Sequence, residues 1–181
     1  MQQIPVDHEI VLKELSLSSA GVIFQSIDNS RQYLSKWLPF VEITKSQADT
    51  EKFIQSVNYS EYNKKEKVFE IWYLEKFAGL LGLKDINENY RKLELGYWLD
   101  EKMQSRGIMT RSCKQLIKHI FGSMQMNRIT VKVAVGNPKS AAIPKKLGFH
   151  FEGVEREGEA LHGKFVDLEI YSLLKKDMII K

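Results

Sequence analysis

The sequence predicts a mixed α/β fold, in which a mostly antiparallel central sheet holds one parallel strand pair and is flanked by helices. Segments of alternating apolar and polar residues, which are typical of strands, recur along the chain. Strands and helices alternate over residues 91–154, and such crossovers predict a locally parallel pair. The 181 residues fit about one domain, which we expect to span residues 8–176.

The first half of the chain predicts three strands and a group of helices. Residues 8–14 alternate and indicate a first strand. Residues 16–38 indicate one or two short helices, and residues 46–65 indicate a longer helix that opens with capping-type residues. Residues 67–73 and 77–85 are apolar runs around a short turn, which predicts a hairpin.

The second half continues with a strand at residues 91–99, where Gly96 predicts a bulge or a close backbone approach. Residues 109–124 carry a helical apolar stripe, and Cys113 on that stripe is expected to be core. A strand at 128–135, a short helix at 137–147 and strands at 149–154 and 164–174 follow. Pro144 cannot donate to the carbonyl of Ser140, so we expect the short helix to break or kink.

Charge and composition narrow the function classes. The net charge is +4, yet residues 102–151 hold ten Lys and Arg residues and no Asp or Glu. A focused basic field suits the phosphates of a cofactor, RNA or an acidic surface, although a solvated basic face would give the same count. No Cys/His cluster with ligand spacing exists, so we expect no metal site. No run approaches the ~18 apolar residues of a membrane helix, and the start is unlike a signal peptide, so we expect a cytoplasmic protein without a membrane segment.

Two strand-to-helix turns in the basic region are candidate phosphate sites. In residues 104–110, a helix start would offer free N–H groups and a positive dipole end, and Gly107 would allow close backbone approach. This turn is neither a P-loop nor a dinucleotide fingerprint. The second turn spans residues 137–140, where Asn137 is a preferred N-cap and Pro138 fits the first helical position.

Taken together, the two turns resemble those of the GNAT acetyltransferases. Gln104 and Gly107 match the family's pyrophosphate loop, Gln/Arg-x-x-Gly-x-Gly/Ala, whereas Met109 replaces a small residue and Ser105 a common glycine. The order and spacing of further segments resemble the branch that acetylates the N-termini of ribosomal proteins. Those segments are Leu34-x-x-Trp37-Leu38-Pro39-Phe40, Gly96-Tyr97-Trp98-Leu99, Gly107-Ile108-Met109-Thr110, Asn137-x-x-Ser140 and Lys146-Leu147-Gly148-Phe149.

The resemblance implies a GNAT fold with a splayed parallel strand pair, and transfer of an acetyl group from acetyl-CoA to an amine. An α-amino group has a pKa of ~7.7–8.0, so a modest base suffices. By position the base is Glu159, with Glu157 or a water as rival, and Ser140 protonates the leaving thiolate or positions the thioester. The resemblance implies these cofactor-binding residues: Trp98, Leu99, Asp100, Gln104, Ser105, Arg106, Gly107, Ile108, Met109, Thr110, Asn137 and Lys146.

The expected acceptor is a protein N-terminus, which would bind in a pocket lined by Trp37, Phe40 and Tyr97. A small amine, such as a polyamine or an antibiotic, is the alternative substrate. A non-catalytic module that binds RNA or the ribosome through the basic segment is an alternative of a different class. A homodimer is compatible with each of these assignments.

Overall fold

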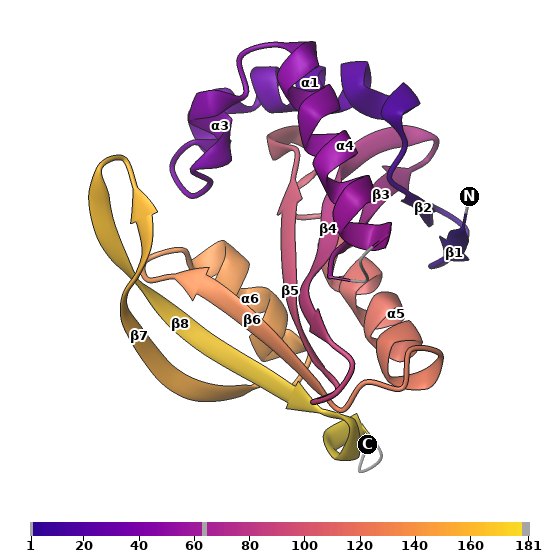
Figure 1. Cartoon of the computed structure of the whole chain (residues 1–181), viewed down its shortest axis with the longest axis vertical. Coiled ribbons are helices and arrows are strands. Elements are labelled where there is room, and N and C mark those ends of the chain that lie inside the picture. The colour runs from indigo at the N-terminus through magenta and orange to yellow at the C-terminus, as the bar shows by residue number, and fades with distance from the viewer. Residues whose placement is uncertain (1, 63–64, 179–181) are drawn as a thin grey trace.

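The computed structural model describes residues 2–62 and 65–178, and in this part of the chain eight strands form one sheet (Figure 1). The strand order is β1-β2-β3-β4-β5-β6-β8-β7. The strands are β1 (Gln3–Pro5), β2 (Ile10–Glu14), β3 (Lys67–Tyr73), β4 (Lys76–Asn87), β5 (Lys92–Leu99), β6 (Arg128–Ala134), β7 (His150–Leu161) and β8 (Lys164–Leu174). Only β5 and β6 run parallel among these neighbours, which confirms the predicted mixed sheet with its parallel pair.

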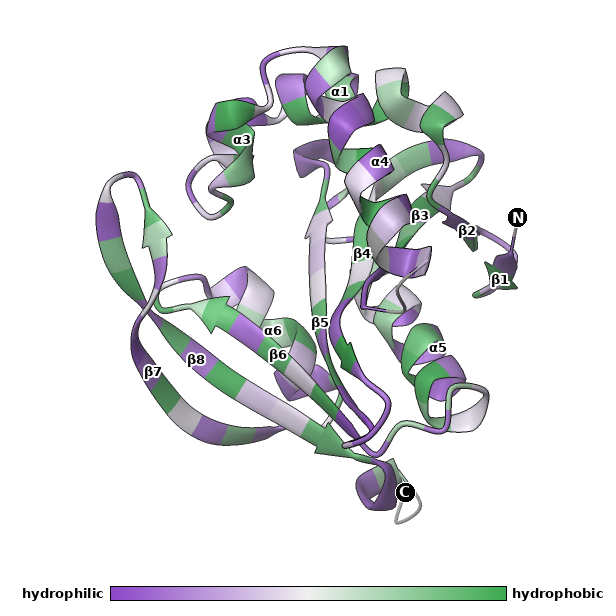
Figure 2. Ribbon diagram, viewed as in Figure 1, coloured by the Kyte–Doolittle hydropathy of each residue, from purple (hydrophilic) through white to green (hydrophobic). Residues whose placement is uncertain are grey.

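Helices cover both faces of this sheet. They are α1 (Ala20–Asn29), α2 (Arg31–Leu34), α3 (Phe40–Ile43), α4 (Gln47–Tyr62), α5 (Ile108–Gly122) and α6 (Pro138–Lys146). Leu80 and Leu81 are neighbours in β4 but belong to different cores, because successive side chains of a strand point to opposite faces. Leu80 packs in the core with α1 and α4, and Leu81 in the core with α5. The central strand β4 is therefore covered on both sides, whereas β6 and β8 alternate between hydrophobic and hydrophilic residues (Figure 2).

The parallel pair is joined only at its beginning. Within the described chain, the β5–β6 register joins Lys92 to Arg128, Leu93 to Ile129 and Glu94 to Thr130. Beyond these pairs β5 stays with β4, and β6 stays with β8. The two strands therefore splay apart, and the arm formed by β6, β8 and β7 leans away from β5 (Figure 1). The wedge between them is bordered by strand edges whose backbone groups have no sheet partner there.

Several element boundaries differ from the prediction. The structure adds the three-residue edge strand β1 and the four-residue helix α3, and it extends β7 to Leu161 instead of ending it at residue 154. The helix predicted over residues 46–65 ends at Tyr62 among the described residues, and residues 63 and 64 lie outside them.

The expectation of a bulge at Gly96 is wrong. The β4–β5 register continues without a shift through Gly96, and its irregularity lies between Lys84 and Asn87, so Gly96 is not a bulge. The close backbone approach occurs at Gly79, where an added Cβ would lie 2.2 Å from the carbonyl oxygen of Trp98. Helix α6 continues through Pro144, so it does not break there, and a bend at this residue stays a prediction.

Candidate active site

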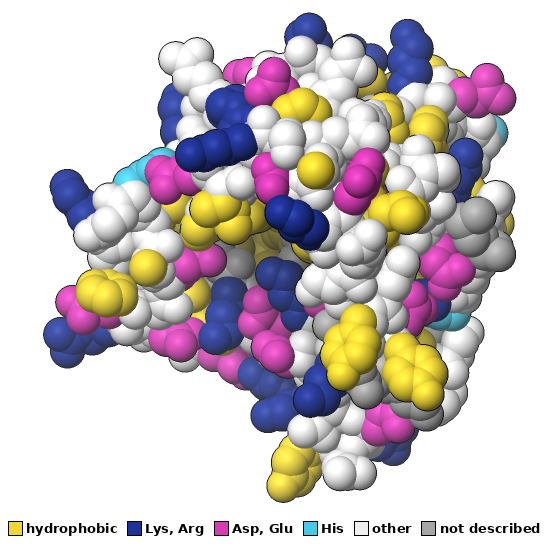
Figure 3. All heavy atoms as spheres, turned by 45° about the horizontal axis from the view of Figure 1, so that its top comes forward, with side chains coloured by type: hydrophobic (Ala, Val, Ile, Leu, Met, Phe, Trp, Pro, Cys, Tyr) yellow, Lys and Arg dark blue, Asp and Glu magenta, His cyan; other side chains and the backbone are white. Residues whose placement is uncertain are grey.

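A cleft of about 630 Å³ fills the wedge between β5 and β6. Its lining comes from the splayed ends of both strands, the start of α5, one side of α6, the α2 region and β7. Figure 3 shows a hollow in the surface, with Lys or Arg and Asp or Glu side chains beside it. Most of the predicted site residues line this cleft: Trp37, Tyr97, Trp98, Leu99, Gln104, Ser105, Gly107, Ile108, Met109, Thr110, Asn137, Ser140, Lys146 and Glu159.

The start of α5 is suited to an anionic group. Gly107 is the N-cap, has a φ of 71° and leaves the helix without a side-chain cap. The first bond of the helix runs from the N–H of Arg111 to the carbonyl of Gly107, at 3.0 Å. The N–H groups of residues 108–110 therefore have no acceptor inside the helix, and they lie at the positive end of its dipole. An added Cβ at Gly107 would meet only Arg111 Nε, at 4.0 Å, so the space above this turn is open.

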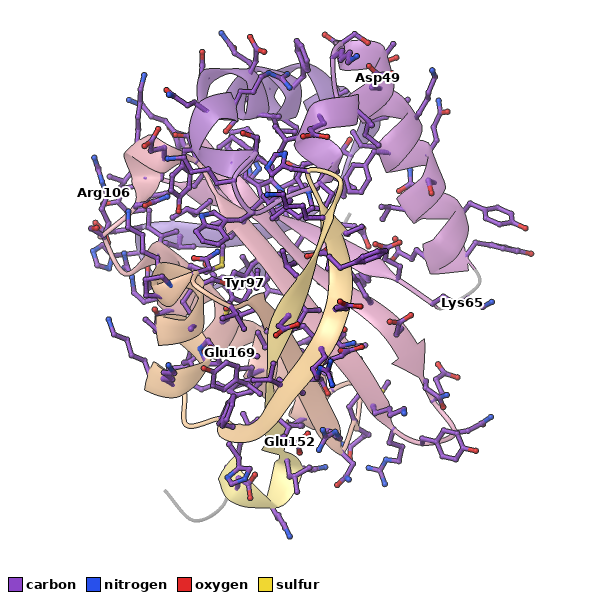
Figure 4. The ribbon with its side chains drawn as sticks, turned by 90° about the vertical axis from the view of Figure 1, so that its left-hand side faces the viewer. Asp49, Lys65, Tyr97, Arg106, Glu152 and Glu169 are labelled. Atoms are coloured by element: carbon purple, nitrogen blue, oxygen red, sulfur yellow. The ribbon has the colours of Figure 1, made fainter. Side chains whose placement is uncertain are left out.

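The loop that leads into α5 is fixed by its own contacts. The N–H of Asp100 donates to the carbonyl of Ala78 at 2.8 Å, and its carboxylate accepts from the Ser26 hydroxyl at 2.8 Å. Asp100 therefore anchors the loop and does not line the cleft. Arg106 is exposed at the outer edge of the molecule (Figure 4) and does not line the cleft either. The expected cofactor contacts of these two residues have no support in the geometry.

The basic residues near the loop differ in their surroundings. The ammonium of Lys139 donates to Gln104 Oε1 at 2.9 Å and lies 5.4 Å from the ring centre of Tyr33. It thus ties α6 to the loop before α5. Lys146 lies at the end of α6 and also lines the cleft.

Trp98 faces the cleft with its backbone, because its side chain is 8% exposed and packs in the core against Phe77.

Ser140 is held at both of its backbone polar groups. Its N–H donates to Asn137 Oδ1 at 3.1 Å, which makes Asn137 the N-cap of α6 as predicted. Its carbonyl accepts a hydrogen bond from the hydroxyl of Tyr97 at 3.0 Å. Figure 4 shows Tyr97 in the interior of the molecule. Burial raises the pKa of Tyr97, so the hydroxyl stays protonated and acts as a donor.

Ionisable side chains of four strands line the same cleft: Lys84 of β4, Glu94 of β5, Lys132 of β6 and Glu159 of β7. Glu159 of β7 is half-buried, and burial raises the pKa of its carboxyl while Lys84 and Lys132 lower it. Its rival Glu157 is exposed, lies outside the cleft lining and donates its N–H to Asp167 Oδ1 at 2.8 Å. Of these two glutamates, only Glu159 lines the cleft.

Glu94 is a cleft residue that the sequence reasoning missed. It lies on β5 at the last β5–β6 pair, and burial raises the pKa of its carboxyl, opposed by Lys132 and Lys84. The signal that could have found it is a charged residue between the apolar Leu93 and Leu95 of one strand. The lining of the cleft thus includes two carboxyls, of Glu94 and Glu159, and the ammonium groups of Lys84 and Lys132.

A second cleft of about 690 Å³ meets the first at Gly96, Tyr97 and Trp98. It lies between the α1, α3 and α4 helices and strands β3 to β5, and most of its lining is apolar. Phe40 lines this cleft, whereas Trp37 lines the first. The three predicted acceptor residues are therefore divided between two clefts, and Tyr97 lines both.

The tip of the β7–β8 hairpin is tied to the helical region. His162 Nδ1 lies 2.5 Å from Glu42 Oε1, and its Nε2 lies 2.6 Å from the carbonyl oxygen of Ser35. These contacts connect the β6–β8–β7 arm to the segment around α3. The contacts of His162 thus form a second connection across the wedge, separate from the three residue pairs that join β5 to β6.

Three further observations concern Cys113, metal ligands and membrane spans. Cys113 is fully buried, and burial raises the pKa of its thiol, so it is a core residue and not a nucleophile. Among residues 2–62 and 65–178, no group of three or more His, Cys, Asp or Glu side chains is arranged to hold a metal ion. No helix in that part of the chain is long and apolar enough to cross a membrane.

The site thus combines a splayed parallel strand pair, a glycine-capped helix start and two carboxyls in one cleft. The chain belongs to the GNAT acetyltransferases, since the model of that family's acetyltransferase domain matches residues 9–150. The GNAT resemblance and fold expected from the sequence are confirmed.

Individual relatives include YdaF of Bacillus subtilis (strain 168), provisionally named as a ribosomal N-acetyltransferase. It is 35% identical over 176 residues, which cover 95% of this chain and 94% of YdaF. Spermidine N(1)-acetyltransferase of Escherichia coli (strain K12) is 24% identical over 165 residues, covering 90% and 82% of the two chains. Among solved structures, RimL, a ribosomal L7/L12 alpha-N-protein acetyltransferase in complex with coenzyme A, superposes with a TM-score of 0.92 at 26% identity. That superposition covers 96% of this chain and 98% of RimL.

Proposed function

We propose that this protein transfers the acetyl group of acetyl-CoA to the α-amine at a protein N-terminus, with a ribosomal protein as the acceptor. The observation that carries the proposal is the single cleft into which the α5 start, the free edge of β5, Ser140 and Glu159 all face. The names of YdaF and of RimL support the ribosomal acceptor. Such an acceptor is met in the cytoplasm, and residues 8–176 would act as one GNAT domain.

In this proposal the α5 start and the β5 edge hold the acetyl-CoA substrate. The free N–H groups of residues 108–110 bind the pyrophosphate. Residues 97–99 have a strand edge that β6 leaves free, and it pairs with the amides of the pantetheine arm as an added strand would. A backbone N–H of this edge stabilises the oxyanion that develops on the thioester carbonyl.

Glu159 and Ser140 then divide the proton transfers. The neutral amine attacks the thioester carbon, a C–N bond forms, and Glu159 accepts the proton that the nitrogen loses. A carboxyl with a raised pKa is better matched to this task than a solvated one. When the C–S bond breaks, Ser140 either protonates the thiolate, whose thiol has a pKa near 8.5, or positions the thioester.

The lining of the second cleft favours a peptide N-terminus as the acceptor, rather than a small polycation. Its lining is mainly apolar, with Asp49 and Glu66 as carboxylates and Lys52 and Lys84 as cations beside them. A polyamine pocket would need an excess of negative charge, whereas apolar walls suit the side chains that follow an N-terminal amine.

The basic segment has partners within the chain, which weighs against an RNA-binding module. Arg111 Nη1 lies 2.8 Å from both Asp7 Oδ2 and Glu9 Oε2, and Lys132 Nζ lies 2.8 Å from Glu155 Oε2. Arg111 and Lys132 thus have acidic partners from outside residues 102–151.

The test is an acetylation assay with acetyl-CoA and two acceptors, a peptide with the free N-terminus of a ribosomal protein, and spermidine. Peptide acetylation at the α-amine, read by mass spectrometry, is expected. Acetylation of spermidine alone would overturn the acceptor class, and no binding of acetyl-CoA would overturn the proposal as a whole.

The same assay tests the base with two glutamate variants of one strand. Glu159→Gln should lower kcat by ~10²–10⁴-fold without weakening coenzyme A binding, as loss of a general base does. Glu157→Gln, outside the cleft, should stay within about twofold of the parent, the scale of a solvated surface change. The reverse pattern would assign the base to Glu157.

A further inference from the structure

Pro144 leaves one carbonyl of α6 without its helical donor. In a regular helix the carbonyl of residue 140 accepts from the N–H of residue 144, and proline has no N–H. The helix nevertheless continues through Pro144, and the hydroxyl of Tyr97 donates to that carbonyl at 3.0 Å. A side-chain hydroxyl thus takes the place of the missing backbone amide.

The donor comes from the opposite side of the wedge. Tyr97 lies on β5 beyond Glu94, the last residue that pairs with β6, whereas Ser140 lies on α6, which follows β6 in the chain. The Tyr97–Ser140 bond therefore links the two arms of the splayed pair at a point where no sheet hydrogen bond does. Because Asn137 Oδ1 already holds the N–H of Ser140, the bond completes the fixation of this residue.

We infer that Tyr97 is a positioning residue for acetyl transfer, which sets Ser140 in the cleft by supplying the hydrogen bond that Pro144 withholds. This inference rests on the proposed function, because it assumes that Ser140 acts in the transfer. Its consequence is specific: the position of Ser140 depends on β5, the strand whose edge would hold the thioester. A helix with an ordinary residue at 144 would hold Ser140 through α6 alone.

The first test is a double-mutant cycle between Tyr97→Phe and Pro144→Ala, with the full chain. Tyr97→Phe alone should lower kcat roughly threefold to tenfold, the scale of one hydrogen bond, while the Kd for coenzyme A stays unchanged. Alanine at 144 restores a backbone N–H to the carbonyl of Ser140, so Tyr97→Phe should then lower kcat by less than about twofold. An equal loss in both backgrounds would overturn the inference.

A second cycle separates positioning from general support of the fold. With Ser140→Ala as the background, Tyr97→Phe should cause no further loss of kcat, because the hydroxyl that it positions is gone. If Tyr97→Phe lowers kcat by the same factor with and without Ser140, it acts through another route and the inference fails.

Melting temperatures keep the inference testable if the protein acetylates neither acceptor. The stability losses of Tyr97→Phe should shrink in the Pro144→Ala background, because the helix then carries its own donor. Additive losses would mean that the two residues are not coupled through the carbonyl of Ser140. If the stability losses are coupled but no acetyl transfer is found, the proposed function is refuted. The replacement of the missing amide donor by the hydroxyl of Tyr97 would still stand.

Discussion

Gly107→Ala is the sharpest perturbation of the proposed cofactor site. The glycine has a φ of 71° at the N-cap of α5, and an added Cβ would meet no protein atom closer than Arg111 Nε at 4.0 Å. The methyl group therefore projects into the open space where we expect pyrophosphate to lie. It strains the backbone without clashing with the protein, so the effects on folding and on binding can be separated.

The left-handed conformation costs an alanine roughly 1–2 kcal/mol. For a chain of this length, each kcal/mol lowers Tm by about 2–4 °C. A methyl group that displaces phosphate from one N–H removes a charge-assisted hydrogen bond of about 1.5–3 kcal/mol. That loss corresponds to a roughly tenfold to hundredfold weaker Kd for coenzyme A.

Gly163 provides the matched control, since it also has a φ of 71° and an added Cβ there meets nothing within 4 Å. It lies at the tip of the β7–β8 hairpin, outside the cleft lining. Calorimetric titration with coenzyme A and thermal unfolding should show similar losses of Tm for Gly163→Ala and Gly107→Ala. Only Gly107→Ala should lose affinity, and equal Kd values for the two variants would refute the phosphate site.

Two further predictions concern titration. Because Lys84 lowers the pKa of Glu159, Lys84→Met should raise that pKa and move the acidic limb of the kcat profile to higher pH; an unmoved limb would exclude Glu159 as the titrating base. Arg128 and Ser172 lower the pKa of Glu152 to about 2, from a usual 4.5, so its stabilising effect is present above pH 4.5 and lost as pH falls through about 2. Glu152→Gln should therefore lower Tm at pH 7 but not near pH 2, and a pH-independent difference measured by thermal unfolding would contradict this pairing.

The strands that could be predicted from the sequence carry apolar residues. Strands β3 and β8 lie at the predicted residues, Lys67–Tyr73 and Lys164–Leu174. The missed half of β7 is almost wholly exposed, so its sequence has no apolar alternation, and its pairing with β8 is what makes it a strand. Strand β1 has three residues and helix α3 has four, which is too short for a periodic pattern of apolar residues to be recognised.

The site divides in the same manner. Gly107, Ser140 and Glu159 could be chosen from sequence because each lies in a turn or segment with a recognisable order. The hydroxyl of Tyr97 and the carboxyl of Glu94 could not, since their roles depend on which element faces them across the wedge. Sequence reasoning within one helix also cannot find the hydrogen bond that Tyr97 of β5 donates to the carbonyl of Ser140, which Pro144 leaves without a helical donor.

Only three residue pairs of the described chain join β5 to β6. The continuity of the eight-stranded sheet therefore does not indicate how firmly the β6–β8–β7 arm is connected to β5. The ladders between β6, β8 and β7 would survive a separation of the arms, so hydrogen exchange in that arm would report its own opening and not the opening of the joint. A ligand seated between the arms binds only while they are together, and by mass action it makes the separated state rarer. A substrate bound in the wedge would therefore stabilise the arrangement in which the two arms lie together.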